Sequence, residues 1–176
     1  MSGATGPVWR DGGFHADEWI RYTPDSALLA GDYPLLAPLA LFLAEPDRFL
    51  AHEGPLGVTV GAGESVAPLE PYLGKLKLIA LAFPKFSDGR SYSAARLLRE
   101  RLGYKGELRA TGDVLADQIP LMRRCGIASF EVSNGPTRAA LLAGRLAEMH
   151  HYYQPIPTAP REVPSGTRPW LRQPAG

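Results

Sequence analysis

Short apolar runs alternate with segments of helical periodicity from residue 56 onward. The runs have the length and composition of β-strands, and the apolar positions between them recur at a spacing of three to four residues. Strands that alternate with helices in this way predict consecutive βα units and a parallel sheet. The predicted strands are 56–60, 78–83, 107–111 and 127–132, and the predicted helices are 65–73, 92–102, 114–124 and 136–152.

The pattern before residue 56 is less regular. Residues 8–10 and the chain from Phe14 onward flank Asp11-Gly12-Gly13, which predicts a β-hairpin. Residues 17–22 are expected to add a short strand or turn. Apolar positions within 34–52 predict a helix, which Pro46 breaks or restarts.

Three of the four predicted strands are apolar only at alternate positions, and only 78–83 is apolar throughout. A doubly wound sheet has helices on both faces, so its strands should be apolar on both. The alternation favours a half (β/α)-barrel with a polar inner face, and a flavodoxin-like three-layer sheet is the alternative. Four units leave such a barrel open, to be closed by the N-terminal hairpin, a second copy of the chain or another protein. The inner face would carry Thr59, Arg109 and Glu131.

The length of 176 residues predicts one α/β domain over 1–153, with an extended entry in 1–33 and the helix and βα units in 34–153. The proline-rich residues 154–176 exclude a helix or central strand, so we expect an extended tail. Trp170 and Leu171 are candidate partner contacts in that tail. A tail without contacts is the alternative.

Composition excludes several classes of function. A formal net charge of +1 does not favour nucleic-acid binding. The sequence has neither an apolar run near the ~20 residues that span a bilayer nor a visible secretory signal, so we expect a cytoplasmic protein. Cys125 is the only cysteine, which excludes an intramolecular disulfide and a cysteine-cluster metal site. It is expected to be a buried thiol, although two preceding arginines could lower its pKa. We find no dinucleotide fingerprint, P-loop or other known catalytic motif, and so expect no cofactor and no bound metal.

Candidate chemistry lies in the loops that follow the strands, where α/β proteins gather ligands. Lys85, Asp88 and Arg90 are candidates to bind a small oxyanion such as sulfate, sulfite or phosphate at a helix start. In the alternative interpretation, Asp88 caps the helix and Arg90 pairs with it.

Three further residues are candidates for catalysis. Arg109 would either bind an anion or pair with Glu131 on the neighbouring strand. Asp113 and Asp117 would bind a metal or perform acid–base chemistry, or else complement the dipole of the helix that follows.

The run FPKFSDGRSYSAARLLRERLGYKGELRATGDVLADQIPLMRRCG closely resembles a bacterial family of unknown function, domain of unknown function 934 (DUF934). The resemblance is dense from about Phe83 to Phe130 and weaker over residues 35–60. Members often have an aromatic pair after the Asp-Gln, where this chain has Ile119-Pro120. That departure affects the expected packing of the helix and not the resemblance to the family.

The family is usually described as a probable oxidoreductase or accessory protein of sulfite reduction, encoded beside the haem-containing sulfite reductase. Because the residues show no flavin, dinucleotide or iron–sulfur signature, the resemblance implies a non-catalytic partner of the sulfite reductase haemoprotein in sulfur assimilation and cysteine biosynthesis. A homodimer is a further possibility. The alternative function is a small-oxyanion-binding enzyme that uses Lys85, Asp88, Arg90, Arg109 and Asp113 at the mouth of the half-barrel.

Overall fold

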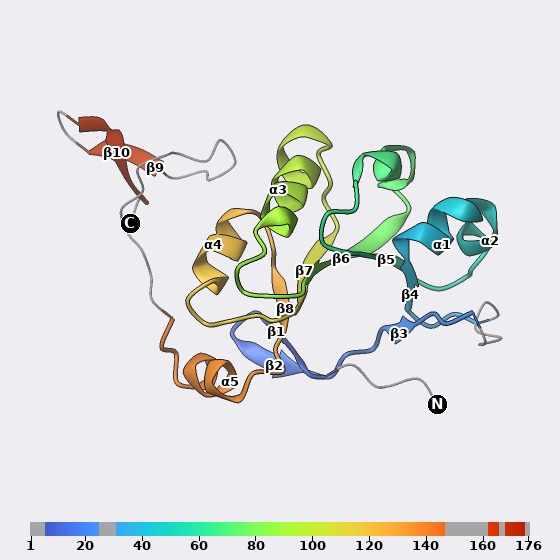
Figure 1. Ribbon diagram of the computed structural model, residues 1–176, viewed down its shortest axis with the longest axis horizontal. Helices are drawn as coiled ribbons and strands as arrows, with labels where there is room; N and C mark the ends of the chain where they lie inside the picture. The colour runs from blue at the N-terminus through green and yellow to red at the C-terminus, as the bar shows by residue number, and fades with distance from the viewer. Residues whose placement is uncertain (1–5, 25–30, 147–161, 166–167, 175–176) are drawn as a thin grey trace.

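The computed structural model describes residues 6–24, 31–146, 162–165 and 168–174. Within these ranges, eight strands form one mixed sheet, and a separate two-stranded sheet lies near the C-terminus (Figure 1). The strands of the large sheet are β1 (Val8–Arg10), β2 (Gly13–His15), β3 (Ile20–Arg21), β4 (Leu35–Pro38), β5 (Leu56–Val60), β6 (Leu76–Phe83), β7 (Glu107–Gly112) and β8 (Ser129–Glu131).

The described helices are short and follow the strands from β4 onward. They are α1 (Leu39–Ala44), α2 (Pro46–Leu50), the 3₁₀ helix η1 (Ala67–Tyr72), α3 (Arg90–Arg96), the π-helical turn η2 (Leu97–Arg101), α4 (Ile119–Arg124) and α5 (Gly135–Leu142). The small sheet consists of β9 (Glu162–Ser165) and β10 (Arg168–Pro174), paired antiparallel. Trp170 and Leu171 lie within β10, and their role as partner contacts stays a prediction.

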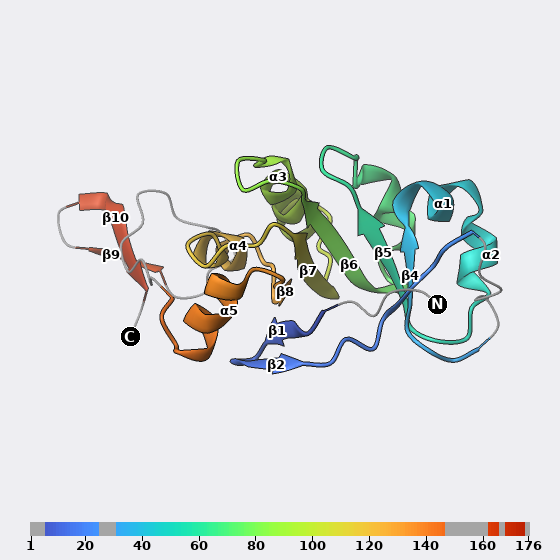
Figure 2. The same cartoon turned by 60° about the horizontal axis from the view of Figure 1, so that its bottom comes forward.

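The order of the parallel strands explains the half-barrel. Strands β3 to β8 lie side by side in the order in which they occur along the chain, so each connection moves in the same direction. A doubly wound sheet needs a reversal of that order, which places helices on its second face. Without a reversal, α1 to α4 cover one face, and the sheet curls away from them (Figures 1 and 2). The predicted α/β half-barrel is confirmed, and the flavodoxin-like alternative is not.

The prediction of one helix across residues 34–52 is wrong in its first part. Leu35, Leu36 and Ala37 are buried in β4, a parallel strand between β3 and β5. A fully buried strand is a continuous apolar run, which helical spacing imitates over a few residues. The chain becomes helical only at Leu39, and a second short helix begins at Pro46, as expected. The described residues therefore contain five βα units instead of the predicted four.

Other predicted helices are also shorter than expected. The segment before α4 is a turn, so the helix begins at Ile119 instead of residue 114. Helix α5 ends at Leu142, and the part of its prediction beyond residue 146 lies outside the described residues. The predicted strands 56–60, 78–83 and 107–111 are all present, with extensions of one or two residues in β6 and β7.

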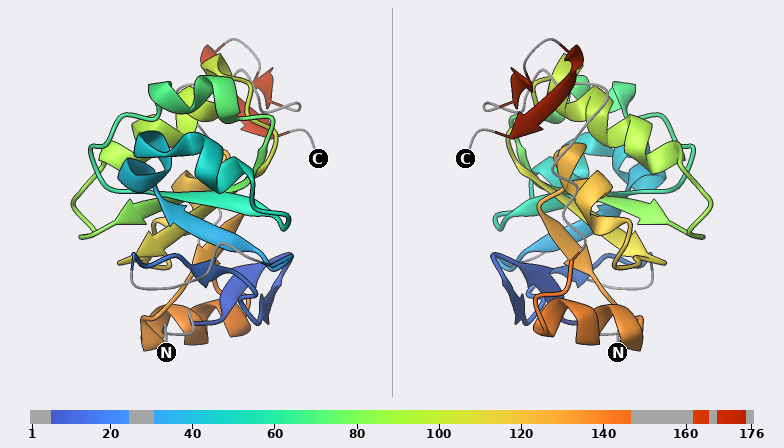
Figure 3. Two further views of the ribbon diagram at one scale, coloured as in Figure 1. Left: turned by 90° about the vertical axis from the view of Figure 1, so that its right-hand side faces the viewer. Right: turned by 90° about the vertical axis from the view of Figure 1, so that its left-hand side faces the viewer.

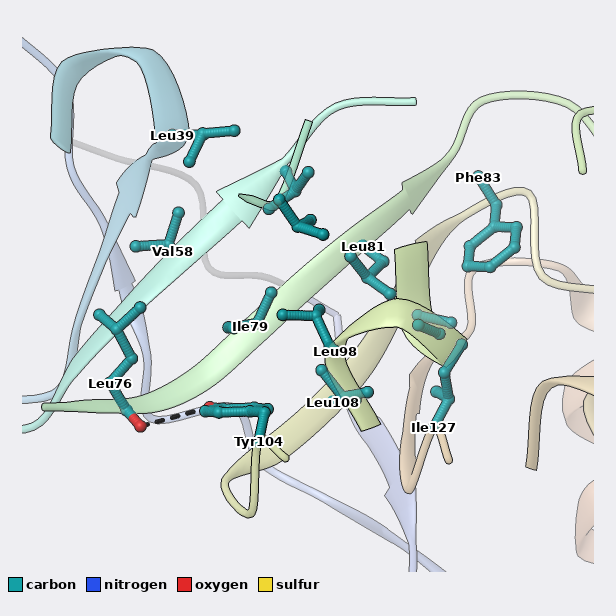
Figure 4. Packing of buried hydrophobic residues seen from close by; sticks show 14 of the residues in the cluster. Leu39, Val58, Leu76, Ile79, Leu81, Phe83, Leu98, Tyr104, Leu108 and Ile127 are labelled. Carbon is teal, nitrogen blue, oxygen red and sulfur yellow. Dashed lines mark hydrogen bonds between the residues drawn. The ribbon is translucent and has the colours of Figure 1, made fainter. Parts of the chain in front are cut away.

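The hydrophobic core lies between the outer face of the sheet and the helices. Val58, Ile79, Leu81 and Leu108 alternate along three central strands and are completely buried. Leu98 of η2 packs onto them, and the Tyr104 hydroxyl donates a hydrogen bond to the Leu76 carbonyl at 3.3 Å (Figure 4). Burial at this density provides most of the stability of a small domain. None of the described helices is long and apolar enough to cross a membrane.

The inner face is partly closed by the N-terminal segment of the same chain. Strand β1 pairs antiparallel with β8, and the chain passes from β2 back along the sheet to β3 at the opposite edge (Figure 2). Side views place these N-terminal strands on the side of the sheet opposite α1 and α2 (Figure 3). On the way, Trp19 packs against Leu36, Leu78 and Ala80 of the inner face. The chain's own entry segment therefore covers much of the face that the sequence left open.

Candidate functional site

The loop 84–90, at the carboxyl edge of the sheet, presents an exposed aromatic side chain on a fixed backbone. The Phe86 N–H donates to Asp113 Oδ2 at 3.1 Å, and the Phe86 carbonyl accepts from Gln118 Nε2 at 2.6 Å. The Phe86 side chain is nevertheless 65% exposed. Two hydrogen bonds thus hold the backbone of an aromatic residue whose ring remains in solvent, although apolar side chains are normally buried.

The second half of this loop is held by an ion pair. Arg90 donates to Asp88 from Nε at 2.9 Å and from Nη2 at 2.6 Å, and the Arg90 N–H also donates to Asp88 at 3.2 Å. The guanidinium lies against Gly63 of the preceding βα loop, where an added Cβ would stand 2.6 Å from Arg90 Nη1. Of the two interpretations of Asp88 and Arg90, the mutual pair is the one that the structure shows. The charge of Arg90 is compensated within the loop.

This pairing lowers the pKa of Asp88 from 3.8 to about 2, because the Arg90 side chain and N–H both donate to the carboxylate. Since the pKa is depressed in the folded state, the pair is fully formed above the ordinary value and is lost as the pH falls through about 2.

Replacing Arg90 with glutamine is expected to raise the pKa of Asp88 toward 3.8, measured by NMR titration of the carboxyl carbon. The Arg96→Gln change, which removes an exposed pair with Glu100, should leave the pKa of Asp88 unchanged. An unchanged pKa of Asp88 in the Arg90→Gln variant would contradict the pairing.

Arg109 belongs to a buried ionic cluster below this edge. Its guanidinium donates to Asp17 Oδ1 at 2.8 Å and to Glu107 Oε1 at 2.9 Å, and its side chain is only 3% exposed. Ser129, opposite Arg109 in the sheet register, donates to the same Glu107 oxygen. Asp17 also accepts from the Trp19 N–H at 3.3 Å, so the cluster ties the N-terminal segment to the sheet.

The predicted pair between Arg109 and Glu131 is therefore wrong. Glu131 lies two residues beyond Ser129 on β8, at the register of β1, and it pairs with Arg21 of β3 at 2.7 Å. The Arg109 guanidinium is already paired with Asp17 and Glu107, and Glu131 is paired with Arg21 instead. The sequence indicated that the inner face is polar but not that Asp17 crosses it. Long-range partners of this kind have no local signal in a sequence.

The structure brings together some of the predicted site residues and separates the others. Asp113 lies beside the 84–90 loop and holds the Phe86 N–H, whereas Asp117 is exposed in the turn before α4. Lys85 is exposed next to Phe86. Arg109 is directed toward Glu107 and Asp17, away from this edge, so the five residues proposed for oxyanion binding do not form one site. Phe86 and Gln118 were not among the residues predicted from the sequence, although Phe86 lies in the loop that contains Lys85, Asp88 and Arg90.

The single cysteine is not arranged for chemistry. Cys125 ends α4, is 6% exposed, and belongs to the hydrophobic core. Burial raises the pKa of its thiol, and the nearby Arg96 and Arg124 only partly oppose that effect. The expected buried thiol is confirmed. Among the described residues, no group of three or more histidine, cysteine, aspartate and glutamate side chains is placed to hold a metal ion.

Together, the fold and this edge define an α/β half-barrel protein with a hydrogen-bonded loop that exposes an aromatic residue. A family model matches residues 57–163, more than half of the chain, and its description is bacterial protein of unknown function (DUF934). The chain belongs to this family. A search of curated proteins found no match.

Proposed function

We propose that this protein is a non-catalytic partner of assimilatory sulfite reductase and that it contacts the reductase through the 84–90 loop. The identity of the partner comes from the family resemblance of residues 83–130. The observation that supports a contact role is Phe86, 65% exposed on a backbone held by Asp113 and Gln118. Aromatic side chains are enriched among the few interface residues that carry most of the binding free energy.

Preorganisation strengthens this proposal. A loop that must become ordered on binding loses part of its binding energy to conformational entropy. Here the Asp88–Arg90 pair and the two hydrogen bonds of Phe86 fix the loop before any partner arrives. The ring of Phe86 would enter an apolar pocket on the partner, and the neighbouring Lys85 ammonium favours an acidic rim around that pocket. Asp113 and Gln118 are then positioning residues for this contact.

Co-purification tests the proposal directly. A tagged chain is expected to retain the sulfite reductase from the same cell, and sulfite reduction is expected to depend on the chain. Phe86→Ala should weaken the association at least about thirtyfold, the cost of losing an interface residue worth about 2 kcal/mol. Because the Phe86 side chain is exposed, the thermal unfolding midpoint of the Phe86→Ala variant should equal that of the wild type. Lys75→Ala, an exposed change just before β6 at the opposite edge of the sheet, should bind like the wild type.

The same assay tests the tail as a second contact. A chain that lacks residues 154–176 is expected to associate more weakly if Trp170 and Leu171 touch the reductase. Normal sulfite reduction without the chain, together with no association, would overturn the partner function. Association that survives Phe86→Ala would overturn the assignment of the loop.

A further inference from the structure

A second surface lies away from the 84–90 loop, between the β1–β2 hairpin and α5. It is an open groove, called here the hairpin groove, lined by Trp9, Gly12, Arg123, Leu142, Gly144 and Leu146, among others. Gly12 and Gly144 have positive φ angles of 81° and 64°, and an added Cβ at either would meet nothing within 4 Å. These two glycines therefore leave backbone, rather than side chains, along the groove.

The groove combines polar surface from Arg123 with an exposed apolar side chain at its rim. Leu142 is 70% exposed, the most exposed large apolar side chain among the described residues. Trp9 is 6% exposed, and its buried indole Nε1–H has no hydrogen-bond partner in the described part of the chain. A buried donor without a partner costs free energy, so unpaired donors are rare in folded proteins. An exposed leucine beside such a donor favours a surface that is covered in a complex.

The charge around the groove is positive. Residues 119–146 contain four arginines and one acid. The acid is Glu131, which lies on the inner face and pairs with Arg21. Arg123 lines the groove, and Arg145 is exposed between two of its lining residues. Neither of these two guanidinium groups has a carboxylate partner in the described part of the chain; Asp11, in the hairpin turn, is the acid nearest in sequence to the groove.

We propose that the hairpin groove binds an acidic amphipathic helix of a partner protein. The leucine-like side chains of that helix would occupy the space between Trp9 and Leu142. The carboxylates of the helix would pair with Arg123 and Arg145. The hollow between Trp9 and Leu142 can receive side chains of a helix, which favours a helical partner over a flat membrane surface. This inference goes beyond the proposed function, because it assigns a second contact surface and does not depend on the 84–90 loop.

The indole N–H of Trp9 is a specific reporter for this site. A synthetic helix of about 18 residues, or about five turns, with leucine on one face and glutamate on the other, would be titrated into the ¹⁵N-labelled full chain. The expected result is a shift of the Trp9 indole signal, assigned by its loss in Trp9→Phe, while the Trp19 indole signal stays in place. Arg123→Glu is expected to weaken binding at least tenfold. Phe86→Ala should not affect it, so this test fails or succeeds independently of the partner function.

Three outcomes would overturn the proposal. A matched peptide with lysine in place of glutamate could bind as well as the acidic one, which would remove the role of charge. The Trp9 signal could stay unchanged at all peptide concentrations, which would mean that the groove is not a binding site or is already filled by the chain itself. Binding to phosphatidylserine vesicles without binding to the acidic peptide would assign the surface to a membrane instead.

Discussion

Replacing Arg109 with methionine is expected to destabilise the folded protein by about 3–5 kcal/mol, the cost of breaking a buried ion pair from one side. The guanidinium is paired with both Asp17 and Glu107, and the Asp17 side chain is only 1% exposed. Without Arg109, the buried Asp17 carboxylate loses its guanidinium partner, while Glu107, whose side chain is 25% exposed, remains partly solvated. The change should be measured as a shift in the urea unfolding midpoint with the slope unchanged.

Two comparisons make this prediction specific. Arg48→Met removes an exposed pair with Glu45, and it should leave the urea unfolding midpoint nearly unchanged. Asp17→Asn should be destabilising alone but should cost less in the Arg109→Met background, because the two residues are coupled. Additive effects would show that the pair is not the source of the loss. A mild effect of Arg109→Met would mean that the cluster is accessible to water and would restore Arg109 as a candidate ligand-binding residue.

The second large effect is expected at Gly57 in β5. A Cβ at this position would stand 2.9 Å from the Leu78 carbonyl oxygen, 2.9 Å from the Trp19 ring and 3.0 Å from Leu36 Cδ1. A glycine inside a strand often marks such a close approach. Gly57→Ala should therefore destabilise the protein by about 1–3 kcal/mol, because the Trp19 ring must move off the inner face. The measurement is again the urea midpoint.

Gly74 is the matched control. It is exposed just before β6, and an added Cβ there meets nothing within 4 Å, so Gly74→Ala should change stability by no more than about 0.5 kcal/mol. Trp19→Leu should reduce the cost of Gly57→Ala without removing it, since the Leu78 carbonyl remains in place. Equal costs of Gly57→Ala in both backgrounds would show that Trp19 does not press on this strand.

Several features of the candidate site follow from residues that are close in sequence. Asp88 and Arg90 are two positions apart, and their pairing was one of two interpretations that the sequence allowed. The charged residues of the 84–90 loop were also visible in the sequence as a candidate site, because loops after parallel strands gather polar residues. The hydrogen bond from the Phe86 N–H to Asp113, 27 residues away, was not visible, because it depends on β6 and β7 being neighbours in register.

The sequence by itself determined the half-barrel. Alternation of apolar and polar residues in 56–60, 107–111 and 127–132 reflects a sheet with helices on one face only, and this periodicity is a local property of each strand. Only the tertiary structure decided what lies on the other face. Asp17 and Trp19 reach Arg109 and Gly57 across large separations in sequence, and such contacts arise from the course of the whole chain. The strand β4 was likewise decided by its neighbours, since a short apolar run becomes a strand or a helix according to what packs against it.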